Sequence, residues 1–578
     1  MQLSLAKGPL DRQPTEIEAV LFNPPRPTDY TTLVTKLNMV PCNLNFLQFI
    51  INGIVAVGVN QSSIALIFEL NITRDDFPSD FYIGVGTAAT QTEGAAEEEG
   101  RGPSVWDHRA KMLPGSIPNS DKFPFAIDGY KRYKEDIKII KDLGVNGYRF
   151  SISWSRILPQ KPWCFFYNKT MGAVDESFAE GSLRGGINQR GVDHYNSLIN
   201  ELKRKGIEPF VTIYHFDMPQ ALQVKYGGYL NSKQDFQDYS DLCFKLFGDR
   251  VKHWFTINEP SSLAVYGYEI GIAPPGRCSL PEGQCGLGAP PPGTCIVPAG
   301  PCFGGNSSTE PYIAAHNLIL AHAAVVKLYR EKYQEEQKGE VGIVLAATYF
   351  APFSKSQEDK AAAKRLFDFT LGWFMEPLVF GDYPRSMRDL VKERLPTFSA
   401  EEKSLLSGSL GNFVGINYYS SAGVKHRPPP PTEKLRHSFD SWAEATAIPD
   451  VSGVSNSNWP QGLQKLMNYV KNKYQRPQVY ISENGYTNTR NDSRSLHERL
   501  YDPHRASYIA RHLYRLNRAM KNGANVKGYF YWALFDDVEW GLGFSLQYGL
   551  YYIDFGNNDK RYPKLSARWF RDFNNKNY

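Results

Sequence analysis

Two glutamates in this chain occupy similar settings although they are far apart in the sequence. Glu259 follows the apolar run 251–257 and precedes Pro260, and Glu483 follows the run 478–481 and precedes Asn484 and Gly485. Side chains at the C-terminal tips of buried strands carry the chemistry of α/β barrels. Two carboxylates that face one sugar can cleave a glycosidic bond. Taken singly, each residue is equally consistent with a surface glutamate beside a turn.

Further polar and aromatic side chains stand at the ends of other apolar runs. They are Gln91, Arg149, His215, Asn258, Tyr419, Trp532, Glu539 and Trp540. Each has a structural explanation, such as a buried histidine, a turn residue or a core tryptophan. Together they supply the donors, acceptors and ring faces that one small polar ligand needs once water is excluded. Their occurrence at successive strand ends therefore favours a binding site.

Eight apolar runs rich in aromatic and β-branched residues predict strands that are buried on both faces. They are Phe81–Ala89, Asn146–Trp154, Glu208–His215, Val251–Asn258, Val341–Tyr349, Phe413–Tyr419, Gln478–Glu483 and Val526–Leu534. Helical spacing of apolar residues between them predicts helices at Asp128–Asp142, Gly191–Lys205, Glu310–Tyr333, Asp359–Phe369, Gln461–Tyr474 and Pro503–Asn522. This alternation predicts an α/β fold, a single (β/α)8 TIM barrel. The competing doubly wound sheet lacks support because no G-x-G-x-x-G follows the first strand.

The chain divides into an atypical N-terminal extension, residues 1–70, and a (β/α)8 catalytic domain, residues 71–578. The extension is polar at first, and its later apolar stretch is broken by polar residues. It has no clear signal peptide, and it is either a displaced leader or an extension that is disordered or packed on the surface. Three irregular stretches, Lys161–Glu180, Ala273–Gly305 and Arg427–Asn458, follow the second, fourth and sixth strands. We expect them to form long loops on the C-terminal face, where barrels build binding sites.

Composition excludes some partners. The net charge is only +5 over 578 residues, with no basic block, so we expect no nucleic-acid partner. The apolar stretch near residues 46–70 is too interrupted for a membrane span, and we expect no membrane partner. The 34 Tyr, 34 Phe and 10 Trp fit either carbohydrate stacking or a large aromatic core. A homo-oligomer remains open.

Cysteines and acceptor sequons favour the secretory pathway, with the protein extracellular (in the apoplast) or in the vacuole. Four of the seven cysteines, Cys278, Cys285, Cys295 and Cys302, share one Pro/Gly-rich loop without a CxxC pair. This arrangement predicts a loop disulfide of open connectivity and no metal site. N-x-S/T sequons occur at Asn60, Asn71, Asn168, Asn306 and Asn491.

The two glutamate motifs, Thr256–Pro260 and Ile481–Gly485, resemble the signatures of family 1 glycoside hydrolases. The resemblance runs from about Asp75 to Phe573, and loop features such as Pro275–Cys278 resemble plant β-glucosidases most closely. The stretch Lys161–Glu180 is absent from the usual pattern, and the segment after Asn458 is short.

The resemblance implies that Glu259 is the acid/base and Glu483 the nucleophile of a retaining reaction. It implies that Arg149 and Tyr419 orient the nucleophile and that Trp532 stacks under the sugar ring. The residues that it assigns to the sugar hydroxyls are Gln91, His215, Asn258, Glu539 and Trp540. It also implies that Trp459 forms a wall of the aglycone site. An anionic Glu539 would repel a 6-phosphate.

The function expected from these features is a retaining β-glucosidase that hydrolyses a small-molecule O-β-D-glucoside of plants without a cofactor. Two alternatives remain. A transglucosidase would use the same carboxylate pair with an alcohol acceptor, and a catalytically silent homologue would bind the sugar without hydrolysing a glycoside. The preference among glucose, fucose and galactose is also open.

Overall fold

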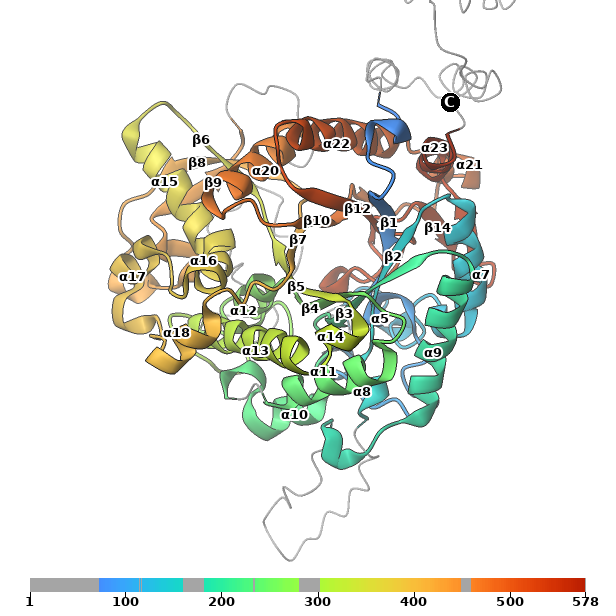
Figure 1. Ribbon diagram of the computed structural model, residues 1–578, viewed down its shortest axis with the longest axis horizontal. Helices are drawn as coiled ribbons and strands as arrows, with labels where there is room; N and C mark the ends of the chain where they lie inside the picture. The colour runs from blue at the N-terminus through green and yellow to red at the C-terminus, as the bar shows by residue number, and fades with distance from the viewer. Residues whose placement is uncertain are drawn as a thin grey trace, which may run out of the picture. The chain divides into compact units, whose positions relative to one another are not determined.

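A closed barrel of eight parallel strands forms the centre of the protein (Figure 1). The computed structural model describes residues 72–113, 115, 117–159, 181–231, 234–279, 302–448 and 459–576. The barrel strands are β1 (Tyr82–Gly86), β2 (Gly147–Ser151), β3 (Glu208–Tyr214), β4 (His253–Asn258), β5 (Glu340–Ala346), β7 (Phe413–Asn417), β10 (Val479–Asn484) and β12 (Val526–Trp532). Each pairs in parallel with the next in chain order, and β12 closes on β1. All eight predicted strands are confirmed, which establishes the (β/α)8 fold.

Aromatic side chains fill the inside of the barrel below the site. One cluster is made by residues from strands around the ring: Phe210, Phe255, Val344, Phe413, Tyr480 and Phe530. The ring of Phe210 packs edge-to-face on Phe530 at 4.7 Å and stacks on His253 at 4.2 Å. A packed interior of this kind makes the barrel a solid support, so ligands are confined to its rim.

Helices surround the barrel (Figure 1). The longer ones are α7 (Gly129–Asp142), α9 (Gln189–Arg204), α11 (Gln234–Phe247), α13 (Glu310–Lys332), α15 (Gln357–Phe367), α20 (Gln461–Lys473), α22 (Pro503–Lys521) and α23 (Leu565–Asn574). Helix α9 illustrates why they form. Its apolar residues Val192, Tyr195, Ile199 and Leu202 recur at helical spacing and are all buried.

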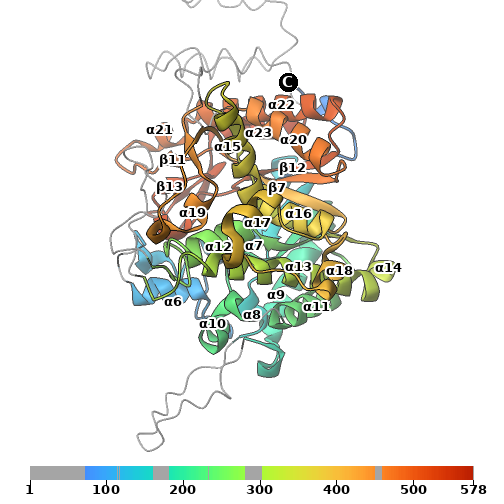
Figure 2. The ribbon, with the colours of Figure 1, turned by 90° about the vertical axis from the view of Figure 1, so that its left-hand side faces the viewer.

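Shorter elements gather at one end of the barrel. Helix α6 (Val105–Met112), helix α19 (His437–Asp440) and the strand pair β11 (Asn488–Thr489) and β13 (Leu546–Gln547) lie on the left in Figure 2. Helix α14 (Gln334–Gln337), which precedes β5, lies on the opposite side. The left-hand side is therefore the C-terminal face of the barrel.

Two sequence expectations need correction. The predicted fifth strand is divided, because the chain leaves the barrel after Ala346 and forms β6 (Tyr349–Pro352) in a separate sheet. That sheet contains β8 (Ser421–His426) and β9 (Ala443–Thr446), so part of the stretch expected to be irregular is a strand. Strand β9 pairs antiparallel with β8, a long-range contact that a short polar run does not reveal.

Irregularities in strand pairing lie just before both glutamates. The pairing of β4 with β5 shifts register between Phe255 and Asn258, and that of β10 with β7 shifts between Ile481 and Glu483. Such bulges bend a strand and re-aim the side chains that follow. The turn after β10 passes through Gly485. A side chain does not fit there, because a Cβ would lie 2.0 Å from the carbonyl oxygen of Trp532.

One disulfide, Cys278–Cys302, closes the base of the cysteine-rich loop. Cys243 is free and buried in α11. Cys285 and Cys295 lie outside the described residues, as do Lys161–Glu180 and the N-terminal extension, whose boundary stays a prediction. Residues Ser62–Asn575 form one compact unit, which contains every element named here. No described helix is both long and apolar enough to cross a membrane.

Candidate active site

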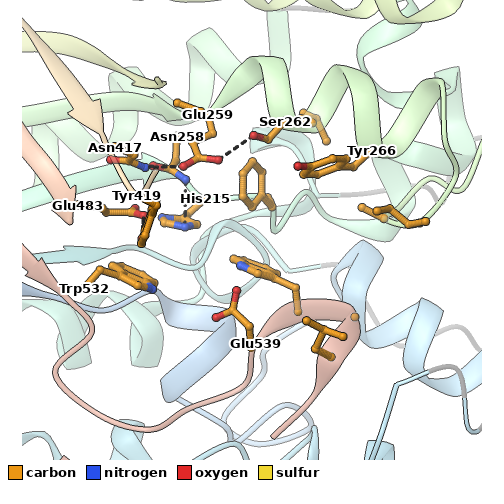
Figure 3. A pocket seen from close by; sticks show the side chains of 18 of the residues that line it. His215, Asn258, Glu259, Ser262, Tyr266, Asn417, Tyr419, Glu483, Trp532 and Glu539 are labelled. Atoms are coloured by element: carbon orange, nitrogen blue, oxygen red, sulfur yellow. Dashed lines mark hydrogen bonds between the residues drawn. The ribbon is translucent and has the colours of Figure 1, made fainter. Parts of the chain in front are cut away.

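A cavity of about 500 Å³ opens at the C-terminal face of the barrel. Eight of the eleven predicted site residues line it: His215, Asn258, Glu259, Tyr419, Glu483, Trp532, Glu539 and Trp540. The side chains of Glu259, Glu483 and Glu539 approach the cavity from different sides (Figure 3). The structure thus brings together strand ends that are distant in the sequence.

Glu483 is held by two donors. Arg149 Nη1 donates to its Oε1 at 2.5 Å, and the Tyr419 hydroxyl donates to its Oε2 at 2.6 Å. Arg149 is 1% exposed, so this ion pair is almost completely shielded from water. Short hydrogen bonds from a cation and a hydroxyl fix the direction of the carboxylate.

Glu259 stands at the junction of β4 and helix α12 (Pro260–Tyr268). Its backbone is left-handed, with φ 42° and ψ 58°, which is strained for a residue with a side chain. Pro260 is well suited to the first helical position because its missing N–H has no partner to lose there. The strained turn directs the Glu259 carboxyl to the cavity rather than along the strand.

The surroundings of Glu259 differ from those of Glu483. Asn417 Nδ2 donates to its Oε1 at 2.8 Å, and the Ser262 hydroxyl donates to its Oε2 at 2.7 Å. No cation contacts it among the described residues. Burial, and to a smaller extent the charge of Glu483, raise the pKa of Glu259 to about 7. Glu259 is therefore substantially protonated near neutral pH.

A short chain of hydrogen bonds connects the two carboxyl groups. Arg149 Nη2 donates to Asn258 Oδ1 at 2.7 Å, and Asn417 Nδ2 donates to the same oxygen at 3.1 Å. Arg149 and Asn417 in turn contact Glu483 and Glu259 respectively. Arg149, Asn258 and Asn417 all stand on barrel strands, so this chain of hydrogen bonds ties the positions of the two carboxyl groups to the barrel.

His215 is a neutral donor and acceptor. Burial, followed by the nearby charge of Arg149, lowers the pKa of His215 well below its usual value. The amide nitrogen of Asn258 donates to His215 Nε2 at 3.1 Å, which places the ring hydrogen on Nδ1. Nδ1 has no partner among the described residues.

Glu539 forms the opposite wall, and Gln91 lies behind it. Gln91 is fully buried and donates to the carbonyl of Val538 at 2.7 Å and to Glu539 Oε2 at 3.5 Å. Burial, then the charges of Glu483 and Glu259, raise the pKa of Glu539 to about 8. Glu539 is therefore mostly protonated near neutral pH, which does not support the expected repulsion of a 6-phosphate by an anionic Glu539. The lining itself contains no lysine or arginine that would bind a phosphate.

Aromatic rings complete the cavity. The His215 ring lies nearly parallel to both Trp532 and Trp540, at 5.7 Å from each. Trp540 contacts Trp106 of α6 at 5.1 Å. Flat apolar faces beside polar groups suit a sugar, whose rings carry C–H faces as well as hydroxyls.

Three predicted residues do not line the cavity. Arg149 and Gln91 lie behind its walls and act on lining residues, as described above. Trp459 lies elsewhere, with its ring 6.0 Å from Tyr349 of β6 and 5.0 Å from Lys465 Nζ. Helix α20 begins at Gln461, so the short connection holds Trp459 beside β6. The expected role of Trp459 as an aglycone wall stays a prediction.

The structure adds residues that the sequence analysis did not assign. Ser262 and Asn417 hold Glu259, and apolar side chains form the outer part of the cavity: Trp106, Leu263, Tyr266, Ile270, Ile272, Pro274 and Leu542. Ser262 stands three residues after Glu259 in α12, a spacing that returns a side chain to the helix start. The apolar residues come from loops and carry no local signal. No group of three metal-ligating side chains occurs among the described residues.

Comparison with known proteins agrees with this geometry. The profile of glycosyl hydrolase family 1 matches residues 73–163 and 177–578. β-Glucosidase 24 of Oryza sativa subsp. japonica is 44% identical over 511 residues, which cover 87% of this chain and 94% of the relative. Furostanol glycoside 26-O-β-glucosidase of Hellenia speciosa is also 44% identical over 511 residues, covering 86% of this chain and 83% of that protein.

Solved structures show the same similarity. A rice β-glucosidase mutant in a covalent complex with Glc has a TM-score of 0.76 at 40% identity, covering 87% of this chain and 99% of that one. A fungal β-glucosidase from Humicola insolens in complex with glucose has a TM-score of 0.75 at 36% identity, covering 86% and 98%. The profile match over most of the chain, together with these relatives, establishes that the chain belongs to glycosyl hydrolase family 1.

Proposed function

We propose that this protein hydrolyses the O-β-D-glucosidic bond of a small-molecule glucoside with retention, using Glu483 as nucleophile and Glu259 as acid/base. The contrast between the two carboxyl groups carries the proposal. Glu483 is paired with Arg149 and Tyr419, whereas Glu259 contacts only neutral donors and has a pKa near 7. One cavity thus holds a carboxyl group paired with a cation beside one that has only neutral partners and a raised pKa, the contrast that two-carboxylate catalysis requires.

In the first step, Glu483 attacks the anomeric carbon and the bond to the leaving oxygen breaks. Glu259 delivers its proton to that oxygen, so the aglycone departs as a neutral alcohol. The sugar is then held as an ester of Glu483 while the anomeric configuration is inverted once. Arg149 and Tyr419 hold the attacking carboxylate in a single orientation, which reduces the entropy lost on reaching the transition state.

In the second step, water replaces the ester. Formation of the ester removes the negative charge of Glu483, which is one of the two causes that raise the pKa of Glu259. The pKa of Glu259 therefore falls, and its carboxylate takes a proton from the incoming water. Attack by that water inverts the anomeric carbon again and regenerates both carboxyl groups.

The polar inner part and the apolar outer part of the cavity support a glycoside with a small apolar aglycone. His215, Asn258 and Glu539 offer hydrogen-bonding atoms next to the tryptophan rings. The outer walls are formed by apolar residues such as Leu263, Ile272 and Leu542. Glucose is the sugar named for the relatives, and we extend it to this chain on that similarity.

Secretion is part of the proposal. The Cys278–Cys302 disulfide supports it, because disulfides persist in oxidising compartments. Two sequon asparagines, Asn306 and Asn491, are exposed on the surface. Glycans on these residues in protein isolated from its natural source, detected by mass spectrometry, are the expected result.

Two variants test the assignment of roles. Glu483→Ala should abolish hydrolysis of 2,4-dinitrophenyl β-D-glucoside, and added azide should restore turnover with α-glucosyl azide as product, because azide then attacks directly. Glu259→Ala should keep the first step with this good leaving group, and azide should yield β-glucosyl azide from the ester. The two variants serve as controls for each other. Identical azide anomers from both, or full activity of Glu483→Ala, would refute the assignment.

A further inference from the structure

A second cavity, of about 240 Å³, lies beside the substrate cavity and has no role in the chemistry above. Its walls come from α6, from helix α10 (Gln220–Tyr226) and from the chain on either side of the disulfide. The lining residues are Val105, His108, Arg109, Met112, Leu113, Gln220, Gln223, Pro274, Pro275, Arg277 and Phe303. Pro274 lines both cavities, so one loop separates them.

Arg109 is a buried cation in this second cavity. The residue is 6% exposed. Its only hydrogen bond to a described residue runs from Nη1 to the carbonyl of Gly271, at 3.4 Å. Within the described part of the chain, no carboxylate forms an ion pair with it.

The neighbouring charges are already paired or of the same sign. Arg277 binds Glu310 through two contacts of 2.8 and 2.6 Å, and Asp107 is paired with Arg101 at 2.8 Å. Burial and then the charge of Lys111 lower the pKa of His108, so this ring is neutral at pH 7. Among the residues that the structure describes, Arg109 is therefore the uncompensated charge of the cavity.

A buried guanidinium without a counter-ion is unfavourable. Arginine does not deprotonate in proteins, so it cannot escape the cost by losing its charge. Burying an unpaired charge costs far more than burying a paired one. Natural proteins seldom leave a charged side chain this deeply buried without a partner. An anion in the adjoining cavity would supply the missing partner.

We propose that the cavity binds a small organic acid, with its carboxylate on Arg109 and its apolar body between α6 and Phe303. The planar fork of a guanidinium matches the two oxygens of a carboxylate. Gln220 and Gln223 supply amide groups nearby, while Val105, Leu113 and Pro275 provide apolar walls. An inorganic anion would satisfy the charge but would leave these walls in contact with water. Since Pro274 belongs to both cavities, the bound acid would contact the loop that also contacts the substrate.

Binding is tested on the full chain with sodium benzoate as the probe, by calorimetry and thermal unfolding at constant ionic strength. Sodium sulfate and sodium chloride are the reference salts. The variant is Arg109→Gln, which removes the charge and keeps a polar side chain. The matched control is Arg385→Gln, because the Arg385 side chain is 87% exposed on helix α17 (Arg385–Val391).

We expect saturable benzoate binding to the unaltered protein and to Arg385→Gln, and at least a tenfold weaker affinity in Arg109→Gln. The ligand-free Arg109→Gln variant should unfold at the same or a higher temperature, because an uncompensated charge has been removed. A residue that served only to anchor Gly271 would instead give a lower unfolding temperature. Hydrolysis of 4-nitrophenyl β-D-glucoside without benzoate should be unchanged in this variant, which reports on folding independently of the new site.

Three results would overturn the proposal: absence of saturable benzoate binding to the unaltered protein, equal benzoate affinity in Arg109→Gln, or a lower unfolding temperature of ligand-free Arg109→Gln. Sulfate binding tighter than benzoate would assign the cavity to inorganic anions and reject the organic acid. None of these readouts depends on the roles of Glu259 and Glu483, so failure of one proposal leaves the other standing.

Discussion

Removing the hydroxyl of Ser262 should move the alkaline limit of activity to higher pH. The Ser262 hydroxyl donates to Glu259 Oε2 at 2.7 Å and lowers the pKa of that carboxyl, against the larger effect of burial. It does so because the hydrogen bond stabilises the ionised form. In Ser262→Ala the pKa of Glu259 therefore rises, and the proton needed for the first step is retained to higher pH.

The expected size follows from the strength of the bond. A hydrogen bond to a charged group contributes about 1.5–3 kcal/mol, and one pKa unit corresponds to about 1.4 kcal/mol. Ser262 is only partly buried, so water replaces much of the lost bond. We expect a shift of roughly half a unit to one unit, from a pKa of about 7 toward about 8.

The assay is kcat/KM against pH for a glucoside with a poor leaving group, whose departure requires the proton of Glu259. The same profile with 2,4-dinitrophenyl β-D-glucoside should lack the alkaline limb, because that leaving group departs without protonation. Ser261→Ala, the same change one residue earlier in α12, is the matched control, and Ser262→Thr should restore the original profile. An alkaline limb that stays in place or moves to lower pH in Ser262→Ala would refute the reasoning.

Three further outcomes are expected. Tyr419→Phe removes the 2.6 Å hydrogen bond to Glu483. Because a hydrogen bond to a charged group is lost, kcat/KM should fall by about 10- to 100-fold without loss of thermal stability. An unchanged kcat/KM would contradict the role of this hydrogen bond. Replacing Cys278 and Cys302 together by serine opens a link of sequence separation 24 and should lower the free energy of unfolding by about 3 kcal/mol in guanidinium titrations. A reductant should lower the free energy of unfolding of the unaltered protein and leave that of the double serine variant unchanged. Glu259→Gln should gain stability relative to the unaltered protein as pH rises from 4.5 to about 7, because the folded state resists ionisation of Glu259 in this range and the unfolded state does not. The gain in free energy of unfolding should reach at most about 3 kcal/mol. A difference in unfolding temperature between the two proteins that is constant with pH would contradict this expectation.

The barrel was predictable because its strands are buried on both faces. Runs such as Val526–Trp532 are apolar apart from the exposed Lys527, so each strand is visible without knowledge of its partner. Strand β9 was missed because it is short and half-exposed, and only its pairing with β8 makes it a strand. The position of Trp459 depended on the length of the connection to α20, which motif similarity does not specify.

The residues of the site also fall into those that the sequence predicted and those that it did not. Residues at strand tips were predictable, since parallel strands of a barrel end on one face. Ser262 and the apolar outer walls come from a helix start and from loops, whose positions follow from long-range packing. Arg109 is a further case, because its sequence neighbours give no sign that it is buried with no carboxylate partner in the described part of the chain.

The sequence by itself determined the fold, the identity of the two glutamates and the face on which they meet, because these depend on local burial patterns and on motifs at strand ends. Only the tertiary structure decided how the two carboxyl groups differ. Simple alternation from the inward-facing Tyr480 would place Ser482, not Glu483, on the inner face, and the register shift after Ile481 re-aims the strand. The pKa of Glu259 depends on burial and on a charge more than 200 positions away in the sequence, and such an effect exists only once the barrel has closed.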